Sequence, residues 1–272
     1  VWSRDVLREH QLKNIAWGKS CSPLLVGQWV VVTGGEPREK SLLAYNAQDG
    51  RPGWQSGRDR SSYASPVVAN MAGQEQILIV NGHSVSGHRP EDGRLLWEYP
   101  WPGDFPKVAQ PLPLDTHLLL VATGYGIGCS LLKLEPSAQG EWAVTEVWKN
   151  RNLKPKFTNL VRRGRHVYGL DDGILVCLDP ATGNRVWKDG RYGHGQILLV
   201  DDVLLIQSEP GDVVLVEATP ERHRELARLP ALKAKTWNHP VLAGDLLLVR
   251  NDQEAVCYQL AVRQSGHLRA EQ

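Results

Sequence analysis

Several features are scarce in this sequence of 272 residues, and each scarcity excludes a class of protein. Apolar stretches are interrupted, as residues 197–206 are by Asp201 and Asp202, so none reaches the roughly 20 residues that a membrane-spanning helix needs. Lys and Arg number 31 against 30 Asp and Glu, so no excess of positive charge predicts binding to nucleic acid. The four cysteines include no CxxC motif and no adjacent pair, which favours neither a metal site nor a disulfide framework.

Two further scarcities concern the start of the chain and its aromatic residues. No charged segment followed by an apolar one opens the sequence, which begins at Val1, so the residues themselves indicate no destination. Phenylalanine occurs twice and tryptophan ten times, an unusual ratio that the repeats described next explain.

The sequence does contain a repeated unit, and residues 173–187 preserve it best. A hydrophobic strand is followed there by a turn from Asp179 to Gly183 and by a second strand that ends at Trp187. The tryptophans at positions 54, 97, 148 and 187 recur at intervals of 43, 51 and 39 residues. Each unit holds about four short strands rich in Val, Ile and Leu and bounded by Gly, Asp, Asn or Pro. Units of this length and content are typical of β-propeller blades.

We therefore predict an all-β fold, a single β-propeller domain of four-stranded antiparallel blades, with about six blades in this chain. The expected parts are a tail strand of a preceding blade at residues 1–8, blades at approximately 18–56, 60–101, 106–150, 156–189, 192–230 and 236–262, and a C-terminal tail at 263–272. One interpretation is a larger propeller of seven or eight blades whose first blades precede Val1. The alternative is a closed ring of six blades in which residues 1–6 form the fourth strand of the last blade, which removes an exposed edge. The one helical signal, at residues 5–13, predicts a helical turn or a loop.

Some residues of the repeat are predicted to serve the structure alone. Glycine in each turn supplies a positive φ without steric cost, and the tryptophan that follows packs against the neighbouring blade. The residues in these two roles are Trp2, Trp54, Trp97, Trp148, Trp187, Gly50, Gly93 and Gly183. Cys177 and Cys257 occupy one equivalent position in two repeats, which predicts small, buried strand residues.

The segment from Leu178 to Trp187 resembles the repeat of pyrroloquinoline-quinone (PQQ)-like β-propellers. That superfamily includes the quinoprotein alcohol dehydrogenases and the BamB-like outer-membrane assembly lipoproteins. Residues 63–68, 124–128, 131–134, 215–220 and 237–240 also resemble it, so the resemblance covers nearly the whole chain. It implies a protein of the periplasm or one that is secreted. Separately, we expect a monomer. It does not determine the activity, because one propeller architecture serves many functions.

In a propeller the first strand of each blade lines a central channel, and the loop before that strand opens on one face. Polar and aromatic residues occupy these positions in all six repeats, which predicts a concave site for a protein, peptide or saccharide. The candidate binding residues are Lys19, Ser22, Tyr63, Ser65, Gln110, Asn159, His194, Asn238 and His239. The alternative is that these side chains bond to backbone groups of neighbouring blades.

Three functions remain open, and the first is our prediction: a non-catalytic propeller that binds a partner at the channel mouth, with no metal and no cofactor. The second is a PQQ-dependent alcohol or sugar dehydrogenase, which by resemblance would use Ca²⁺, carboxylate ligands, a catalytic Asp and often adjacent cysteines. The candidate positions contain no carboxylate. The third is a hydrolase or lyase that uses His194 and His239 as metal ligands or general bases. The glycine-rich residues 124–128 are interpreted as a propeller turn, because no helix is expected after them.

Overall fold

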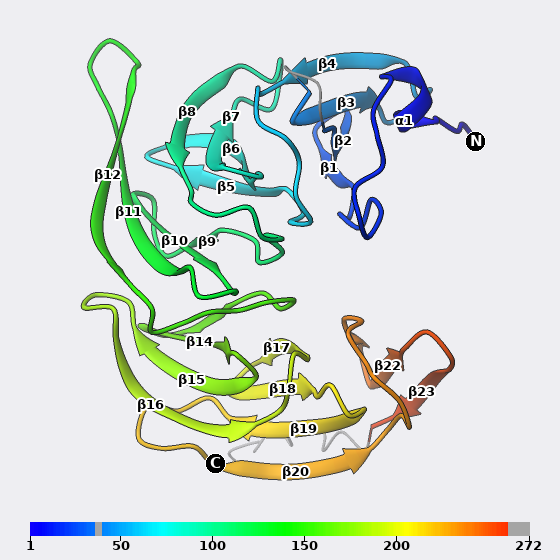
Figure 1. Cartoon of the computed structure of the whole chain (residues 1–272), viewed down its shortest axis with the longest axis vertical. Helices are drawn as coiled ribbons and strands as arrows, with labels where there is room; N and C mark the ends of the chain where they lie inside the picture. The colour runs from blue at the N-terminus through cyan, green and yellow to red at the C-terminus, as the bar shows by residue number, and fades with distance from the viewer. Residues whose placement is uncertain (36–39, 261–272) are drawn as a thin grey trace, which may run out of the picture.

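Short strands rich in Val, Ile and Leu are the main structural elements of this protein. The computed structural model describes residues 1–35 and 40–260, and within them 23 strands and one four-residue helix are formed. The described strands build six antiparallel sheets, each in sequence order, arranged one after another around a common centre (Figure 1). The prediction of an all-β propeller with six visible blades is confirmed.

The first three sheets follow the same pattern, with the first strand innermost and the fourth outermost. Their strands are β1 (Leu24–Val26), β2 (Trp29–Thr33), β3 (Leu42–Asn46) and β4 (Pro52–Ser56); β5 (Val67–Met71), β6 (Gln74–Val80), β7 (Ser84–His88) and β8 (Leu95–Pro100); and β9 (Leu112–Pro113), β10 (Leu118–Thr123), β11 (Gly128–Pro136) and β12 (Trp142–Asn150).

The remaining sheets repeat the pattern, except that the last has three strands among the described residues. Their strands are β13 (Val161–Arg163), β14 (His166–Asp171), β15 (Ile174–Asp179) and β16 (Asn184–Arg191); β17 (Gln196–Val200), β18 (Val203–Gln207), β19 (Asp212–Glu217) and β20 (Glu225–Pro230); and β21 (Val241–Ala243), β22 (Leu246–Arg250) and β23 (Ala255–Gln259). Residues 261–272, which include the end of the predicted last blade and the C-terminal tail, lie outside the described residues.

The hydrophobic core lies between neighbouring sheets. Ile206 and Val214 of the fifth sheet, for example, pack with Tyr168 and Cys177 of the fourth in one buried cluster. Each fully buried aliphatic side chain contributes roughly 1.5–3 kcal/mol. Each sheet is therefore stabilised mainly by the sheets on either side of it.

Tryptophans of the repeat join neighbouring sheets in a recurring way. The indole N–H of Trp148 in β12 donates to the Pro180 carbonyl in the next sheet (2.9 Å). Its ring lies against Gly183, where a Cβ atom would come within 2.8 Å of the ring, and Gly183 has φ +73°. Glycine is therefore needed here both for its conformation and for the space it leaves. Trp54 contacts Gly93 in the same way.

Other tryptophans repeat or vary this contact. Trp2 lies against Gly50 and donates to the Ala47 carbonyl (3.0 Å), as the tryptophan of a sheet before the first one would do. Trp187 donates to the Thr219 carbonyl (3.0 Å) in a turn that has no glycine. Trp97 departs from the pattern and donates to the side chain of Gln76 in its own sheet (2.7 Å).

A β-bulge precedes the tryptophan in three sheets. Val147 and Val186 are left unpaired, since the ladder continues from Glu146 to Trp148 and from Arg185 to Trp187. A bulge increases the local twist and redirects the next side chain. At Trp148 and Trp187 the ring is thereby turned toward the following sheet, whereas Trp97, which also follows a bulge, contacts Gln76 in its own sheet.

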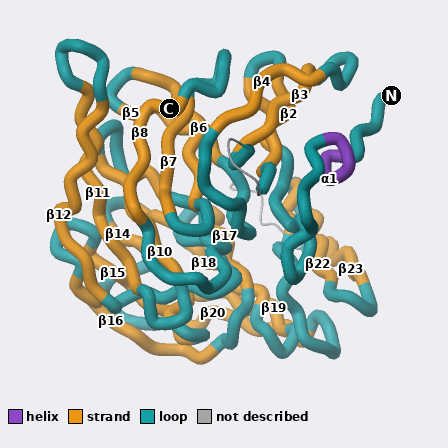
Figure 2. Tube along the Cα trace, turned by 45° about the horizontal axis from the view of Figure 1, so that its top comes forward, coloured by secondary structure: helices purple, strands orange, loops and turns teal. Residues whose placement is uncertain are grey.

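Residues 1–8 do not form the predicted tail strand. Val6–Glu9 form the helix α1, whose N-cap residue Asp5 accepts a hydrogen bond from the Arg8 amide (3.0 Å). The physical reason is that Val6 and Leu7, both partly buried, pack against Leu43 and Tyr45 of the first sheet, which needs no strand pairing. Figure 2 shows α1 beside this sheet.

Among the described residues, the last sheet is covered on one face only. Residues 1–6 do not pair with β23 among the described residues, so the closed ring of six blades is not formed. Val241 and Leu248 are consequently exposed by 54% and 45%. Cys177 is buried as predicted, but the prediction for Cys257 is wrong, because Cys257 lies in this last sheet and is exposed.

Candidate binding face

Antiparallel order brings all the connections between sheets to one face of the propeller. The first strand of each sheet starts at this face, and the second and fourth strands end there. We call it the loop face; it consists of residues 10–23, 57–66, 101–111, 151–160, 192–195 and 231–240, with the turns that join second to third strands. The opposite face, with the turns between first and second and between third and fourth strands, is the turn face.

Four of the predicted site residues form a continuous polar belt on the loop face: Ser22, Ser65, Gln110 and Asn159. The Ser22 amide donates to Ser65 Oγ (2.8 Å), and Gln110 Nε2 donates to the Ser65 carbonyl (3.2 Å). Asn159 Oδ1 accepts from the Gln110 amide and its Nδ2 donates to Gln110 Oε1, both at 2.9 Å. The belt ties together the first four sheets and engages the side chains of Ser65, Gln110 and Asn159, while Ser22 takes part through its backbone amide.

Lys19 is also engaged within the protein. Its Nζ donates to the carbonyl and the hydroxyl of Thr33 (2.6 and 3.1 Å) and to the Gly34 carbonyl. Burial lowers its pKa from the usual value. An ammonium group has three donors, so none remains for a ligand. Lys107, fully buried, bonds to the Gly82 carbonyl (2.5 Å) in an equivalent position.

The two candidate catalytic histidines have free imidazole groups. Within the described part of the chain, no side chain bonds to a ring nitrogen of His194 or His239, and no carboxylate lies within 4.0 Å of one. Burial, and then the charge of Lys156, lowers the pKa of His194, so its ring is neutral at pH 7. A general base is normally oriented by a third group. The arrangement leaves these rings free to contact a ligand but unoriented for catalysis.

The remaining predicted site residues lie next to aromatic residues. Tyr63 packs against Trp17, with ring centroids 5.7 Å apart, and accepts a hydrogen bond from the Trp17 amide (3.3 Å). His194 packs edge-on against Phe157 (5.6 Å). Asn238 follows Trp237, and its side chain has no hydrogen-bond partner among the residues described.

Exposed aromatic rings on the loop face are further functional candidates, and the sequence reasoning missed two of them, Trp17 and Phe105. Trp17, Phe105 and Trp237 are exposed by 73%, 54% and 44%. Phe157 packs against Trp237 at 4.8 Å, so both phenylalanines of the chain lie on this face and neither is in the core. Their position in loops just before inner strands was the available signal.

Tyr125 belongs to the same aromatic group. It lies in the turn between β10 and β11 with φ +57°, which is unusual for a residue with a side chain. Its ring stacks on Phe105 at 5.2 Å and 5°, and Lys156 Nζ lies 5.3 Å from its centre. The glycine-rich segment 124–128 is thus a turn, as expected, and it presents an aromatic ring at the surface.

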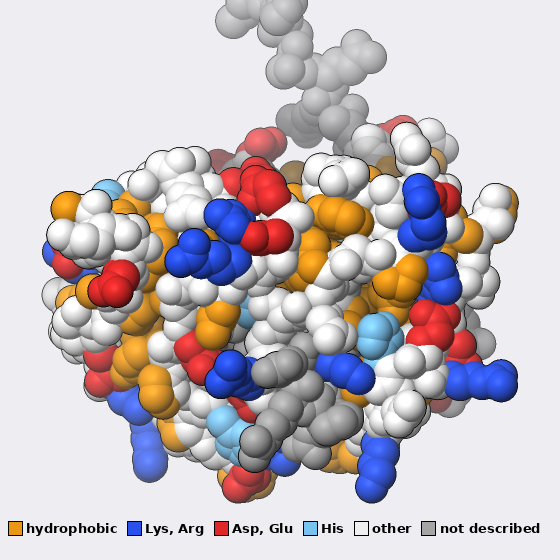
Figure 3. All heavy atoms as spheres, turned by 90° about the horizontal axis from the view of Figure 1, so that it is seen from above, with side chains coloured by type: hydrophobic (Ala, Val, Ile, Leu, Met, Phe, Trp, Pro, Cys, Tyr) orange, Lys and Arg blue, Asp and Glu red, His pale blue; other side chains and the backbone are white. Residues whose placement is uncertain are grey.

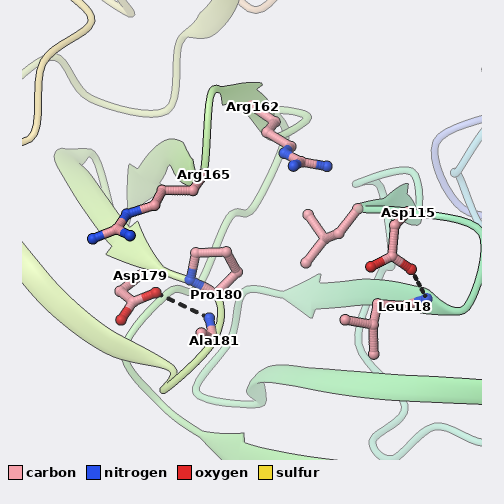
Figure 4. A pocket seen from close by; sticks show the side chains of 8 residues that line it. Asp115, Leu118, Arg162, Arg165, Asp179, Pro180 and Ala181 are labelled. Carbon is pink, nitrogen blue, oxygen red and sulfur yellow. Dashed lines mark hydrogen bonds between the residues drawn. The ribbon is translucent and has the colours of Figure 1, made fainter.

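Two cavities differ in their charges. A cavity of about 470 Å³ on the loop face lies between the second and third sheets. It is lined by Pro102, Gly103, Phe105, Tyr125, Gly126, Ile127, Lys149, Asn150 and Arg151. A cavity of about 270 Å³ on the turn face is lined by Arg162 and Arg165 but also by Asp115 and Asp179. Figure 4 shows Arg165 on the same side of that cavity as Asp179, and Arg162 on the side of Asp115.

A sequence model of the family described as outer membrane protein assembly factor BamB matches residues 1–189. The chain belongs to this family.

Solved structures share the propeller fold. BamB from Moraxella catarrhalis is similar with a TM-score of 0.61 at 19% identity, over 82% of this chain and 67% of that one. Sqt1 from Saccharomyces cerevisiae is similar with a TM-score of 0.65 at 11% identity, over 86% of this chain and 70% of that one. No curated protein sequence matches the chain significantly.

The alternative function, a PQQ-dependent dehydrogenase, would need a site for Ca²⁺. Ca²⁺ takes six to eight oxygen ligands, mostly carboxylates. Within residues 1–35 and 40–260, no three His, Cys, Asp or Glu side chains form a group able to hold a metal ion. The amide oxygens of the polar belt already accept bonds from the belt itself. The only helix in the same residues, α1, is far too short to cross a membrane.

Proposed function

We propose that this protein is a non-catalytic propeller that binds a protein partner through its loop face. The observation that carries the proposal is the set of exposed aromatic rings there, including Phe105 and Trp237. Aromatic side chains are enriched in protein interfaces and supply a large part of the binding energy. Large apolar side chains gathered on a surface commonly mark such a site.

The polar groups of the same face support binding over catalysis. The belt residues and Lys19 are occupied by bonds that position the loops, so the aromatic rings are held on a rigid base. His194 and His239 contribute neutral rings that a partner can cover without removing a charge from water. No cofactor enters the proposal.

The family description supports a more specific partner. Because the family is that of an outer membrane protein assembly factor, we place the protein in the periplasm or at the outer membrane. The partner is then a component of that assembly, and one monomer of this chain supplies the loop face.

Photo-crosslinking tests the proposal directly. Phe105 and Trp237 are each replaced by p-benzoylphenylalanine in cells that produce the protein, and Ala181, exposed on the turn face, is replaced as a matched control. We expect irradiation to yield one discrete adduct with an envelope protein from positions 105 and 237 and none from 181. Adducts from 181 alone, or equal adducts from all three positions, would refute the proposal, as would PQQ- and Ca²⁺-dependent oxidation of an alcohol by the purified protein.

A further inference from the structure

We infer that the partner inserts an apolar side chain, flanked by carboxylates, into the loop-face cavity between the second and third sheets. The inference rests on the proposed function and adds the chemistry of the partner. Phe105, Tyr125 and Ile127 give this cavity of about 470 Å³ an apolar wall. A cavity of this volume accommodates a side chain such as Phe or Leu.

The charges around the cavity are of one sign. Lys149 and Arg151 line it, and no carboxylate does. Lys156 lies beside it, over the ring of Tyr125. A carboxylate of the partner next to the apolar anchor would therefore meet cations already in place.

Cations without an acidic neighbour continue across the loop face. In the part of the chain that is described, several cations of this face form no ion pair with a carboxylate within 4.0 Å, among them Lys149, Arg151, Lys156, Arg191 and Lys235. Lys235 Nζ lies 4.7 Å from the centre of the exposed ring of Trp237. Lys156 Nζ lies 5.3 Å from the centre of the Tyr125 ring. Positive charge and aromatic surface thus occur together at two places on this face.

Two carboxylates of the same face, those of Asp104 and Glu209, are already engaged by the protein. Asp104 bonds to Arg60 (2.8 Å) and contacts His83 (3.0 Å). Glu209 accepts bonds from the His194 amide (3.0 Å) and from the indole of Trp237 (2.9 Å). Arg60 compensates the charge of Asp104, and Glu209 lines a second cavity in which Arg191, Lys233 and Lys235 outnumber it.

Other surfaces of the molecule lack this combination. The turn-face cavity has two arginines but also two aspartates in its lining (Figure 4). The side of the molecule shown in Figure 3 has basic and acidic side chains interspersed. Complementary charge gives specificity and orientation, so an acidic, apolar segment is the partner chemistry that fits the loop face alone.

A labelled peptide tests the inference with the whole chain. The probe is a fluorescent 12-residue peptide of Asp and Glu with two Phe residues, and binding is measured by anisotropy. One control peptide carries Lys in place of the acids, and another carries Ser in place of Phe. The loop-face variant is K149E/R151E, and the matched control R162E/R165E makes the same change of net charge on the turn face.

We expect the acidic Phe peptide to bind the unmodified chain more tightly than either control peptide. The loop-face variant should weaken this binding by about tenfold or more, and the turn-face variant by less than about twofold. Raising the salt concentration should weaken it as well. Equal binding of the Lys peptide, equal effects of the two variants, no binding at millimolar peptide, or preferential binding to phosphatidylglycerol vesicles would overturn the inference.

The crosslinking experiment separates this result from the proposed function. If K149E/R151E abolishes neither the adduct from position 105 nor that from 237, the loop face still binds a protein and the acidic chemistry alone is wrong. If the unmodified chain gives no loop-face adduct, the proposed function itself fails.

Discussion

At the scale of single residues, His88 is an ionisable side chain held in a fully buried site. Its Nδ1 lies 2.9 Å from Ser56 Oγ and its Nε2 lies 2.9 Å from Ser86 Oγ. The Gly93 carbonyl is a further neighbour of Nδ1 (3.3 Å). Burial lowers the pKa of His88 from 6.5 to about 4, so the folded protein accommodates the neutral ring.

This pKa predicts that acid weakens the fold. Above pH 6.5 the ring is neutral in both the folded and the unfolded chain. Between pH 6.5 and 4 the unfolded chain binds a proton that the folded chain does not, so the free energy of unfolding falls, by about 2 kcal/mol at pH 5. Urea unfolding at pH 7.5 and pH 5 measures the loss. His88→Gln should show a smaller difference between the two pH values, and an equal difference would contradict the assignment.

At the scale of structural elements, the contact between a tryptophan and the turn of the next sheet is the unit that repeats. A tryptophan N–H reaches a turn carbonyl, and the ring occupies the space above a glycine. Gly183 and Gly164 lie in the same sheet and both have positive φ, at +73° and +57°. Only Gly183 lies under a tryptophan ring; a Cβ on Gly164 would meet nothing within 4 Å.

A comparison of Gly164 with Gly183 measures what this contact contributes to the free energy of unfolding. Gly164→Ala and Gly183→Ala should both lose roughly 1 kcal/mol from the left-handed backbone conformation. Gly183→Ala should lose about 1–3 kcal/mol more, because its Cβ would lie 2.5 Å from Asn150 Nδ2 and 2.8 Å from the Trp148 ring. Urea unfolding of both variants gives the difference, and equal losses would show that the ring moves away without cost.

Elements that depend on the repeat were the predictable ones. The spacing of Trp148 and Trp187 indicated blades because each turn and ring must occupy the same place in every unit. Residues whose surroundings depend on a neighbouring sheet were not predictable in this way. Cys177 and Cys257 have equivalent positions in the sequence, yet one is buried and the other exposed, because no sheet covers the outer face of β23 among the described residues.

Some residues of the candidate site could be predicted from the sequence and others could not, for the same reason. Ser65, Gln110 and Asn159 could be placed together from the sequence, because each precedes an inner strand, but their mutual hydrogen bonds could not be foreseen. Phe105 and Tyr125 come from a loop and a turn that meet only in the folded ring. The repeat spacing in the sequence does not predict such a contact.

At the scale of the whole molecule, the core consists of separate clusters between successive sheets. Leu78 belongs to a cluster shared by the first three sheets, and Leu247 to one shared by the last two. The two clusters have no residue in common. Stability in such an arrangement is approximately a sum of sheets and of nearest-neighbour interfaces.

This arrangement predicts that a destabilising substitution in one sheet accelerates amide exchange only in that sheet and its neighbours. Leu247 is 1% exposed, and Leu247→Ala should cost about 2–5 kcal/mol and accelerate amide exchange in β17–β23, while β5–β8 keep their protection. Leu78→Ala, at a fully buried position, should accelerate exchange in β1–β12 and leave β21–β23 unchanged. Hydrogen exchange read by mass spectrometry resolves the sheets separately. If Leu247→Ala accelerated exchange in β5–β8 as much as in β21–β23, the six sheets would unfold as one unit, and interfaces between neighbours would not be sufficient to describe the stability of this propeller.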